Sequence, residues 1–162
     1  VEKAPEWRGQ RVFVKHEVDG KGYELRLSEE SAGTQKLMGL AAFLLAALER
    51  GGTVVVDELD AKLHPKLLRY VILLFKDPEV NKSGAQLIFS SQDVSTMRND
   101  VFRRDEIWFA ARGEGEASQL WSLADIHESN GNLVSKNAAF DKQYLSGRYG
   151  ADPYLTRIEE WD

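Results

Sequence analysis

A short β-branched run, followed at once by acidic residues, constrains this chain most. Residues 53–56 are one threonine and three valines; Asp57 and Glu58 come next, and Asp60 follows shortly after. An apolar run without polar alternation is typical of a strand that is buried on both faces, so we expect a central strand of an α/β sheet. The carboxylates then lie at the carboxyl end of that strand, where open α/β sheets bind their ligands.

The two adjacent carboxylates suggest two different tasks. A hydrophobic strand ending in Asp-Glu is the arrangement that nucleotide-hydrolysing enzymes use to hold Mg²⁺ and to orient a water molecule. Asp57 would hold Mg²⁺ through a coordinated water, because Mg²⁺ keeps several of its waters. Glu58 points to the other side of the strand end and would polarise the attacking water. The alternative is that these acidic residues only end the strand and begin a loop.

The remaining patterns predict a single layered α/β domain. Its sheet is expected to be largely parallel, with an N-terminal β-hairpin and flanking helices. The expected elements are a hairpin (11–17 and 22–27), helices (35–50 and 65–76), and strands (53–56, 86–90, 107–111 and 118–123) with a short helix before the third strand. Residues 1–10 are expected to form a flexible lead. Residues 130–162 are expected to form an extension whose aromatic-rich part, 139–150, packs back on the domain.

Composition excludes several classes of protein. The chain has no cysteine, so disulfides and thiolate metal sites are ruled out. A net charge of −5 disfavours a fold whose whole surface binds nucleic acid. No apolar stretch reaches the roughly 18 residues of a membrane span, so we expect no membrane partner. The absence of cysteine does not determine the redox compartment, and a cytoplasmic location is the default expectation.

A small-residue loop precedes the first predicted helix. Residues 31–35 read Ser-Ala-Gly-Thr-Gln, and the N-terminus of a helix presents unpaired N–H groups to an anion such as phosphate. Gly33 would permit close approach, and the hydroxyl of Ser31 could donate a hydrogen bond. An ordinary N-cap at Ser31 explains the same residues equally well.

The order and spacing of these motifs resemble the C-terminal half of an ABC-type, P-loop ATPase head. In that class residues 31–35 correspond to the signature motif, 53–58 to Walker B, and Asp60 to the D-loop. The closer likeness is to the AAA-labelled, ABC-clade ATPases of bacterial phage-defence and abortive-infection systems, which are related to recombination-repair and chromosome-maintenance ATPases. Residues 86–93, 103–109 and 144–150 also look like this family, and the resemblance covers roughly residues 11–155.

The resemblance implies roles for individual residues and for partners. Asp57 serves Mg²⁺ and Glu58 is the catalytic carboxylate, and Asp60 lies where two heads meet. The signature-motif residues would contact ATP bound to a second head of the same kind, in a homodimer; they are Ser31, Gly33, Thr34 and Gln35. An effector subunit, such as a nuclease, and nucleic acid stay open as further partners.

Two departures from the family pattern bear on hydrolysis. Gln92 stands where such families carry a switch histidine; it can hydrogen-bond a γ-phosphate or orient water, but it cannot become cationic. No Gly-x-x-x-x-Gly-Lys-Ser/Thr stretch occurs in the sequence, so the phosphate-binding loop and its lysine are missing. We therefore expect the N-terminal half of the head to be cut off or supplied by another chain.

Two other functions remain as alternatives. A dimerisation or scaffold module with a lapsed ATPase site is favoured by Gln92 and by the missing phosphate loop. A two-metal nuclease could use the carboxylates of Asp57, Glu58, Asp60 and Asp93, although no further nuclease pattern is present.

Overall fold

The computed structural model describes residues 12–112, 117–128 and 131–151. The predicted lead at 1–10 lies outside these residues, as do residue 130 and residues 152–162 of the predicted extension. The strands and helices are β1 (Phe13–Val18), β2 (Lys21–Arg26), α1 (Ala32–Arg50), β3 (Thr53–Val56), α2 (Pro65–Lys76), β4 (Gln86–Phe89), β5 (Trp108–Arg112), β6 (Ser118–Ser122) and α3 (Phe140–Leu145). The short 3₁₀ turns are η1 (Leu27–Glu29), η2 (Val94–Thr96), η3 (Arg104–Glu106) and η4 (Leu123–Asp125).

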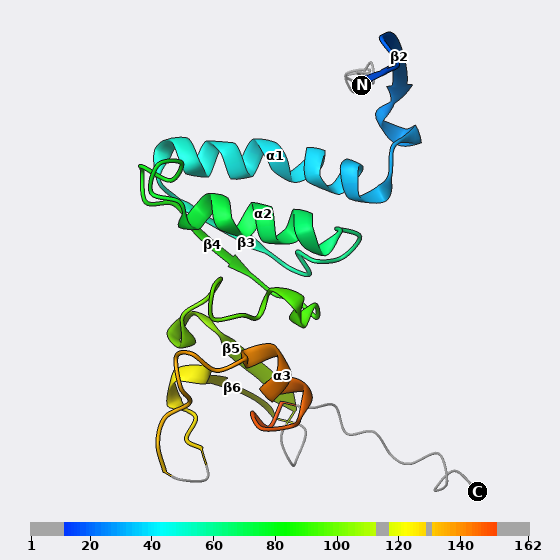
Figure 1. Cartoon of the computed structure of the whole chain (residues 1–162). Helices are drawn as coiled ribbons and strands as arrows, with labels where there is room; N and C mark the ends of the chain where they lie inside the picture. The colour runs from blue at the N-terminus through cyan, green and yellow to red at the C-terminus, as the bar shows by residue number, and fades with distance from the viewer. Residues whose placement is uncertain (1–11, 113–116, 129–130, 152–162) are drawn as a thin grey trace, which may run out of the picture.

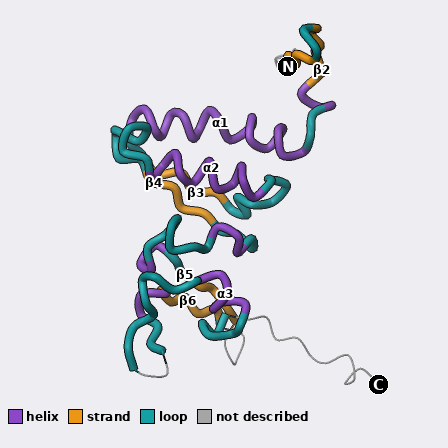
Figure 2. The backbone as a smooth tube through the Cα atoms, viewed as in Figure 1, coloured by secondary structure: helices purple, strands orange, loops and turns teal. Residues whose placement is uncertain are grey.

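Helices α1 and α2 lie side by side over one face of the β3–β4 pair (Figure 1). The two strands are parallel, with Val54 opposite Leu87 and Val56 opposite Phe89. These four side chains pack in one core with side chains of the two helices, among them the fully buried Leu68 of α2. Loops follow the carboxyl ends of both strands (Figure 2). The first residues beyond the strands, Asp57 and Ser90, are exposed.

The prediction that β3 is buried on both faces is wrong. Val55 is 73% exposed, and its cross-strand neighbour Ile88 is 56% exposed. Side chains alternate along a strand, so these two share the face opposite the helices. The helices cover one face only, and none of the described residues shields Val55 or Ile88 on the other.

The prediction of a largely parallel sheet is also not met among the described residues. They form three separate two-stranded sheets, of which only β3–β4 is parallel. The β1–β2 and β5–β6 pairs are antiparallel, because short connections can join antiparallel neighbours whereas parallel ones need a crossover. The α/β class and the order of the predicted elements are nevertheless those of the structure.

Helix α1 begins three residues earlier than the predicted start at residue 35. Ser31 is its N-cap, and the Ser31 Oγ accepts a hydrogen bond of 3.1 Å from the backbone N–H of Thr34. This cap satisfies one of the free N–H groups of the first turn. The hairpin is tied to the start of α1 by a 2.5 Å hydrogen bond between His16 Nε2 and Glu30 Oε1.

Strands β5 and β6 form a second packed unit with α3 and the segment that follows it. Phe109 of β5 stacks on Tyr144 with ring centroids 5.7 Å apart, and it also contacts Tyr149 and Trp121. Phe140 and Tyr149 are buried in this cluster. The aromatic-rich stretch at 139–150 thus contributes buried side chains to the core of this second unit.

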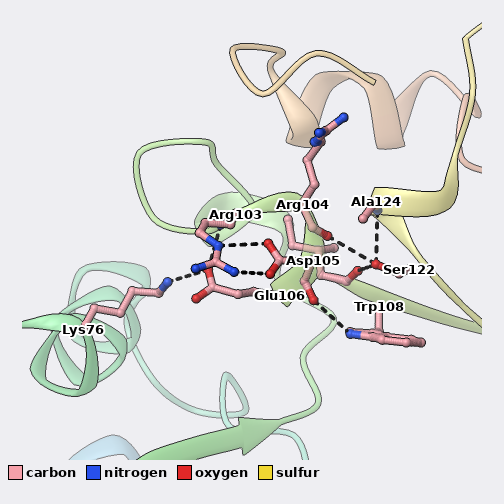
Figure 3. A network of polar contacts seen from close by, with 9 residues as sticks. Lys76, Arg103, Arg104, Asp105, Glu106, Trp108, Ser122 and Ala124 are labelled. Carbon is pink, nitrogen blue, oxygen red and sulfur yellow. Dashed lines mark hydrogen bonds and ion pairs between the residues drawn. The ribbon is translucent and has the colours of Figure 1, made fainter. Parts of the chain in front are cut away.

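A polar network joins α2 to the second unit (Figure 3). Lys76 Nζ donates to Glu106 Oε2 at 2.6 Å, and the same oxygen accepts the Arg103 N–H at 2.7 Å. Hydrogen bonds from the Arg103 guanidinium lower the pKa of Asp105. Lys76 also lies 5.0 Å from the ring centroid of Phe102, a residue that packs against both cores. The junction is thus held by charge on its surface and by an aromatic side chain inside.

No helix in the described part of the chain is long and apolar enough to cross a membrane.

The buried phenol of Tyr149 makes stability depend on alkaline pH. Burial, together with the charge of Glu128, raises the pKa of Tyr149 to about 12 from its ordinary value of 10.0. The unfolded chain therefore loses this proton at lower pH than the folded chain, and stability falls between pH 10 and pH 12. Tyr149→Phe removes this dependence. It also removes the 2.7 Å hydrogen bond to Gln143, at a cost of about 1 kcal/mol near pH 8.

The expected result is that the stability gap between wild type and Tyr149→Phe narrows as pH rises from 8 to 11. Urea unfolding at several pH values measures this gap, and the remaining tyrosines cancel in the comparison. A gap that stays constant over this range would contradict the prediction.

Candidate functional site

The carboxyl ends of β3 and β4 meet because the two strands are parallel and in register. Val56 pairs with Phe89, so Asp57 and Ser90 follow at neighbouring positions. The Ser90 hydroxyl donates to Asp57 Oδ1 and accepts a 2.7 Å hydrogen bond from the Glu58 N–H. The Ser90 carbonyl accepts the Leu59 N–H at 3.0 Å. One serine thus links the ends of both strands and orients the carboxylate of Asp57.

Glu58 adopts a conformation that is unusual for a residue with a side chain. Its φ is 49°, in the left-handed region, which costs about 1–2 kcal/mol for a non-glycine residue. The next residue, Leu59, is completely buried in the core between the helices and β3–β4. Glu58 itself is exposed. The turn therefore anchors its backbone through Leu59 while it presents the Glu58 side chain to solvent.

Asp60 lies close to Gln92. Its Oδ2 accepts a 3.3 Å hydrogen bond from the backbone N–H of Gln92, and its Oδ1 is buried without a hydrogen-bond partner in the structure. The side chain of Gln92 is exposed. Asp93 is used locally, since its Oδ1 accepts the Ser95 N–H at 2.7 Å as the cap of η2. Asp57, Glu58, Asp60 and Gln92 are thus brought together at one edge of β3–β4.

The polar side chains at the start of α1 serve its N-terminal turn. Ser31 caps the helix, and its hydroxyl is 2.9 Å from that of Thr34. Gln35 Nε2 donates to the carbonyl of Glu30 at 2.8 Å. The N-cap interpretation of this loop is confirmed, while nucleotide contact by Ser31, Thr34 and Gln35 stays a prediction.

Gly33 has a structural reason of its own. A Cβ at this position would lie 2.6 Å from the carbonyl oxygen of Lys62, so only glycine lets the first turn of α1 approach this loop. Gly33 therefore lets α1 approach the protein's own backbone closely. Contact between Gly33 and a phosphate remains a prediction. A shallow pocket of about 410 Å³ opens beside this contact, and it is lined by Ala32, Gln35, Lys36, Ala61 and Lys62.

Two residues of the site were missed by sequence reasoning. Lys36 Nζ donates to the carbonyl of Glu58 at 2.5 Å and to that of Ala61 at 3.0 Å, and so connects α1 to the loop after β3. Ser90 makes the corresponding connection from β4. For Ser90, the available signal was its place as the last residue of the predicted strand 86–90, in a sheet expected to be largely parallel. For Lys36, the signal was its spacing of three from Gly33, which puts both residues on one side of the helix.

The geometry does not favour the nuclease alternative. Within the described ranges no group of three or more histidine, cysteine, aspartate or glutamate side chains is placed to hold a metal ion. The carboxylate of Asp93 caps a 3₁₀ turn, and Asp60 contacts a backbone N–H. The carboxylate of Asp57 is exposed and has the Ser90 hydroxyl beside it, while Mg²⁺ binding at Asp57 stays a prediction.

Acidic residues thus lie at the carboxyl end of a parallel strand that helices cover on one face, a place where α/β proteins bind ligands. Residues 3–98 match the family model described as "AAA domain, putative AbiEii toxin, Type IV TA system". The match spans more than half of the chain, and the chain belongs to this family of AAA-type ATPases. ATPases of this type generally bind ATP and Mg²⁺. No curated protein matches the chain.

The close approach at Gly33 can be tested with two glycines of the same helix. Gly33→Ala forces the first turn of α1 away from the Lys62 carbonyl and should destabilise the protein by about 1–3 kcal/mol. Gly39 has open space around its Cβ position, so Gly39→Ala should instead stabilise by about 0.5–1 kcal/mol through helix propensity. Urea unfolding of both variants measures the two effects, and equal shifts of the same sign would refute the packing role of Gly33.

Proposed function

We propose that the chain is the C-terminal half of an ABC-type ATPase head that hydrolyses ATP when two heads come together. The observation that carries this proposal is the pairing of Asp57 and Glu58 at the end of a strand whose parallel neighbour orients them through Ser90. Asp57 would hold Mg²⁺, which would neutralise charge on the phosphates of ATP. Glu58, exposed beside it, would accept a proton from the attacking water.

The family description supports a role in defence. It names an AbiEii toxin and a type IV TA system, and we propose a corresponding role for this chain in abortive infection or another phage-defence assembly. A DNA-repair assembly is the related alternative, since such assemblies use ATPases of similar design.

The exposed apolar surface supports a missing second half. Val55 and Ile88 are exposed on the open face of β3–β4, and Leu120 is 67% exposed beside β5. A groove of about 710 Å³ runs along β3 from Gly52 to Asp57, and Phe43 of α1 contributes to its other wall. Apolar surfaces of this kind mark interaction sites. The N-terminal half of the head, with its phosphate loop, is the partner that would cover this surface and complete the nucleotide pocket.

The first turn of α1 supports the arrangement of two heads. Its N-cap, Ser31, is exposed, and the pocket beside the turn is open to solvent. In the proposed dimer this turn faces the nucleotide of the other head, with Asp60 near the interface. Gln92, in place of histidine, would orient the water or contact the γ-phosphate without carrying a charge.

The scaffold alternative is favoured by one observation at the site. The structure holds Gln92 by its backbone, through Asp60, and leaves its side chain in solvent. A module with a lapsed site would keep the head shape and the dimer but would not hydrolyse ATP.

Binding of ATP should require the missing half. The isolated chain lacks a phosphate loop, so calorimetry on residues 1–162, with folding verified by circular dichroism, should detect weak binding or none. The chain joined to a phosphate-loop half should bind ATP and hydrolyse it. Tight binding by residues 1–162 alone would refute the proposed division of the pocket.

Glu58→Gln should separate binding from hydrolysis. Glutamine keeps the shape of the side chain but cannot accept the proton, so kcat of the joined ATPase should fall by about 10²–10⁴-fold. Binding of ATP is retained, and a nucleotide-bound dimer should accumulate in size-exclusion chromatography. Glu79→Gln, on an exposed loop, is the matched control and should behave as wild type. Wild-type turnover by Glu58→Gln would refute the catalytic role of Glu58, whereas absence of turnover in the joined wild-type chain would favour the scaffold alternative.

A further inference from the structure

Lys36 makes two contacts from α1 to the loop that carries Glu58. Its ammonium group donates to the carbonyl of Glu58 at 2.5 Å and to the carbonyl of Ala61 at 3.0 Å. These acceptors lie 22 and 25 residues away in sequence, so the contacts are tertiary ones. A charged donor makes stronger hydrogen bonds than a neutral one, and Lys36 is only partly exposed. The helix and the loop are therefore held together at a point next to Glu58.

The backbone of Glu58 is fixed from two sides. On the side of β4, the Ser90 hydroxyl accepts the Glu58 N–H at 2.7 Å. On the side of α1, Lys36 binds the Glu58 carbonyl. The left-handed φ of 49° is unfavourable for a glutamate, so it persists only where its surroundings enforce it. The direction of the Glu58 side chain follows from this backbone, and Lys36 is one of the two groups that enforce it.

The same helix turn carries Gly33, which contacts the loop a second time. The space of its missing Cβ is filled by the Lys62 carbonyl, 2.6 Å from where that atom would be. Helix α1 thus contacts this loop at the Lys62 carbonyl through Gly33, and at the Glu58 and Ala61 carbonyls through Lys36. A movement of the first turn of α1 must then move the loop that contains Glu58, because close-packed contacts transmit displacement.

We infer that Lys36 is a positioning residue, which fixes the backbone of Glu58 and couples the N-terminal turn of α1 to that carboxylate. The inference rests on the proposed function, in which Glu58 activates water and the turn at residues 31–35 meets the nucleotide of a second head. Engagement of that nucleotide would then place Glu58 for reaction. Lysine suits this task since its ammonium is a compact donor with three protons, able to reach two carbonyls from one stem.

Kinetics of the joined ATPase with Mg²⁺-ATP test this role. Lys36→Met keeps the length of the side chain without its donors, and kcat should fall about tenfold or more, since a misplacement of about 1 Å can cost roughly 10²-fold in rate. KM for ATP and nucleotide-dependent dimerisation should stay unchanged. Lys36→Arg, which retains donors, should recover most of kcat. Lys66→Met, at an exposed position at the start of α2, is the matched control and should resemble wild type.

A double-mutant comparison separates positioning from a general structural role. If Lys36 acts through Glu58, Lys36→Met should lower the rate in the wild-type background but have no further effect in Glu58→Gln. If Lys36→Met lowers kcat by the same factor in both backgrounds, the inference is overturned. A wild-type kcat for Lys36→Met also overturns it, and so does a variant that loses ATP binding together with turnover. Failure of the proposed function has a different signature: either the joined wild-type chain would not hydrolyse ATP, or Glu58→Gln alone would hydrolyse it at the wild-type rate.

Discussion

The parallel pairing of β3 and β4 is the constraint on which the site depends. Because Val56 lies opposite Phe89, the first residues beyond the two strands are neighbours, and Ser90 can reach both Asp57 and Glu58. A slip of one residue would turn Val54 and Val56 out of the core and carry Ser90 away from the carboxylate. The packing of the helices on Val54, Val56, Leu87 and Phe89 therefore also determines the geometry of the acidic pair.

The loop after β3 combines strain with rigidity. Leu59 is buried, Glu58 is left-handed, and α1 holds the loop through Gly33 and Lys36. An exposed carboxylate on a free loop would sample many directions, whereas this one stands on a backbone bonded at both its N–H and its carbonyl. Strained residues of this kind cluster at functional sites, where the surrounding contacts compensate for their cost. This combination distinguishes Glu58 from an acidic residue that only ends a strand.

Local patterns in the sequence were sufficient for the elements and for the acidic pair. Periodicity and Pro65 gave the helix at 65–76, and the β-branched run gave β3. The predicted start of α1 at residue 35 is three residues late. The first turn holds Gly33 and Thr34, which lack the apolar periodicity on which the prediction rests, and its start depends on the Ser31 cap. For Lys36 and Ser90 the sequence holds only indirect signals, because their partners lie 22 and 33 residues distant along the chain. The predicted burial of β3 is too high because an apolar run shows only that a strand can be buried on both faces. It does not show which part of the chain would cover the second face.

The uncovered face and Asp57 lie on the same side of β3. Side-chain alternation puts Thr53 and Val55 on the open face, and continuing it by two residues brings Asp57 to that side; on β4, Ile88 and then Ser90 follow the same rule. The hydrogen bond between Ser90 and Asp57 agrees with this placement. A body that buried Val55 and Ile88 would gain about 25 cal/mol for each Å² of apolar surface removed from water, and it would then also meet Asp57. In the proposed head of two halves, assembly over the open face would therefore also bring the second half to Asp57.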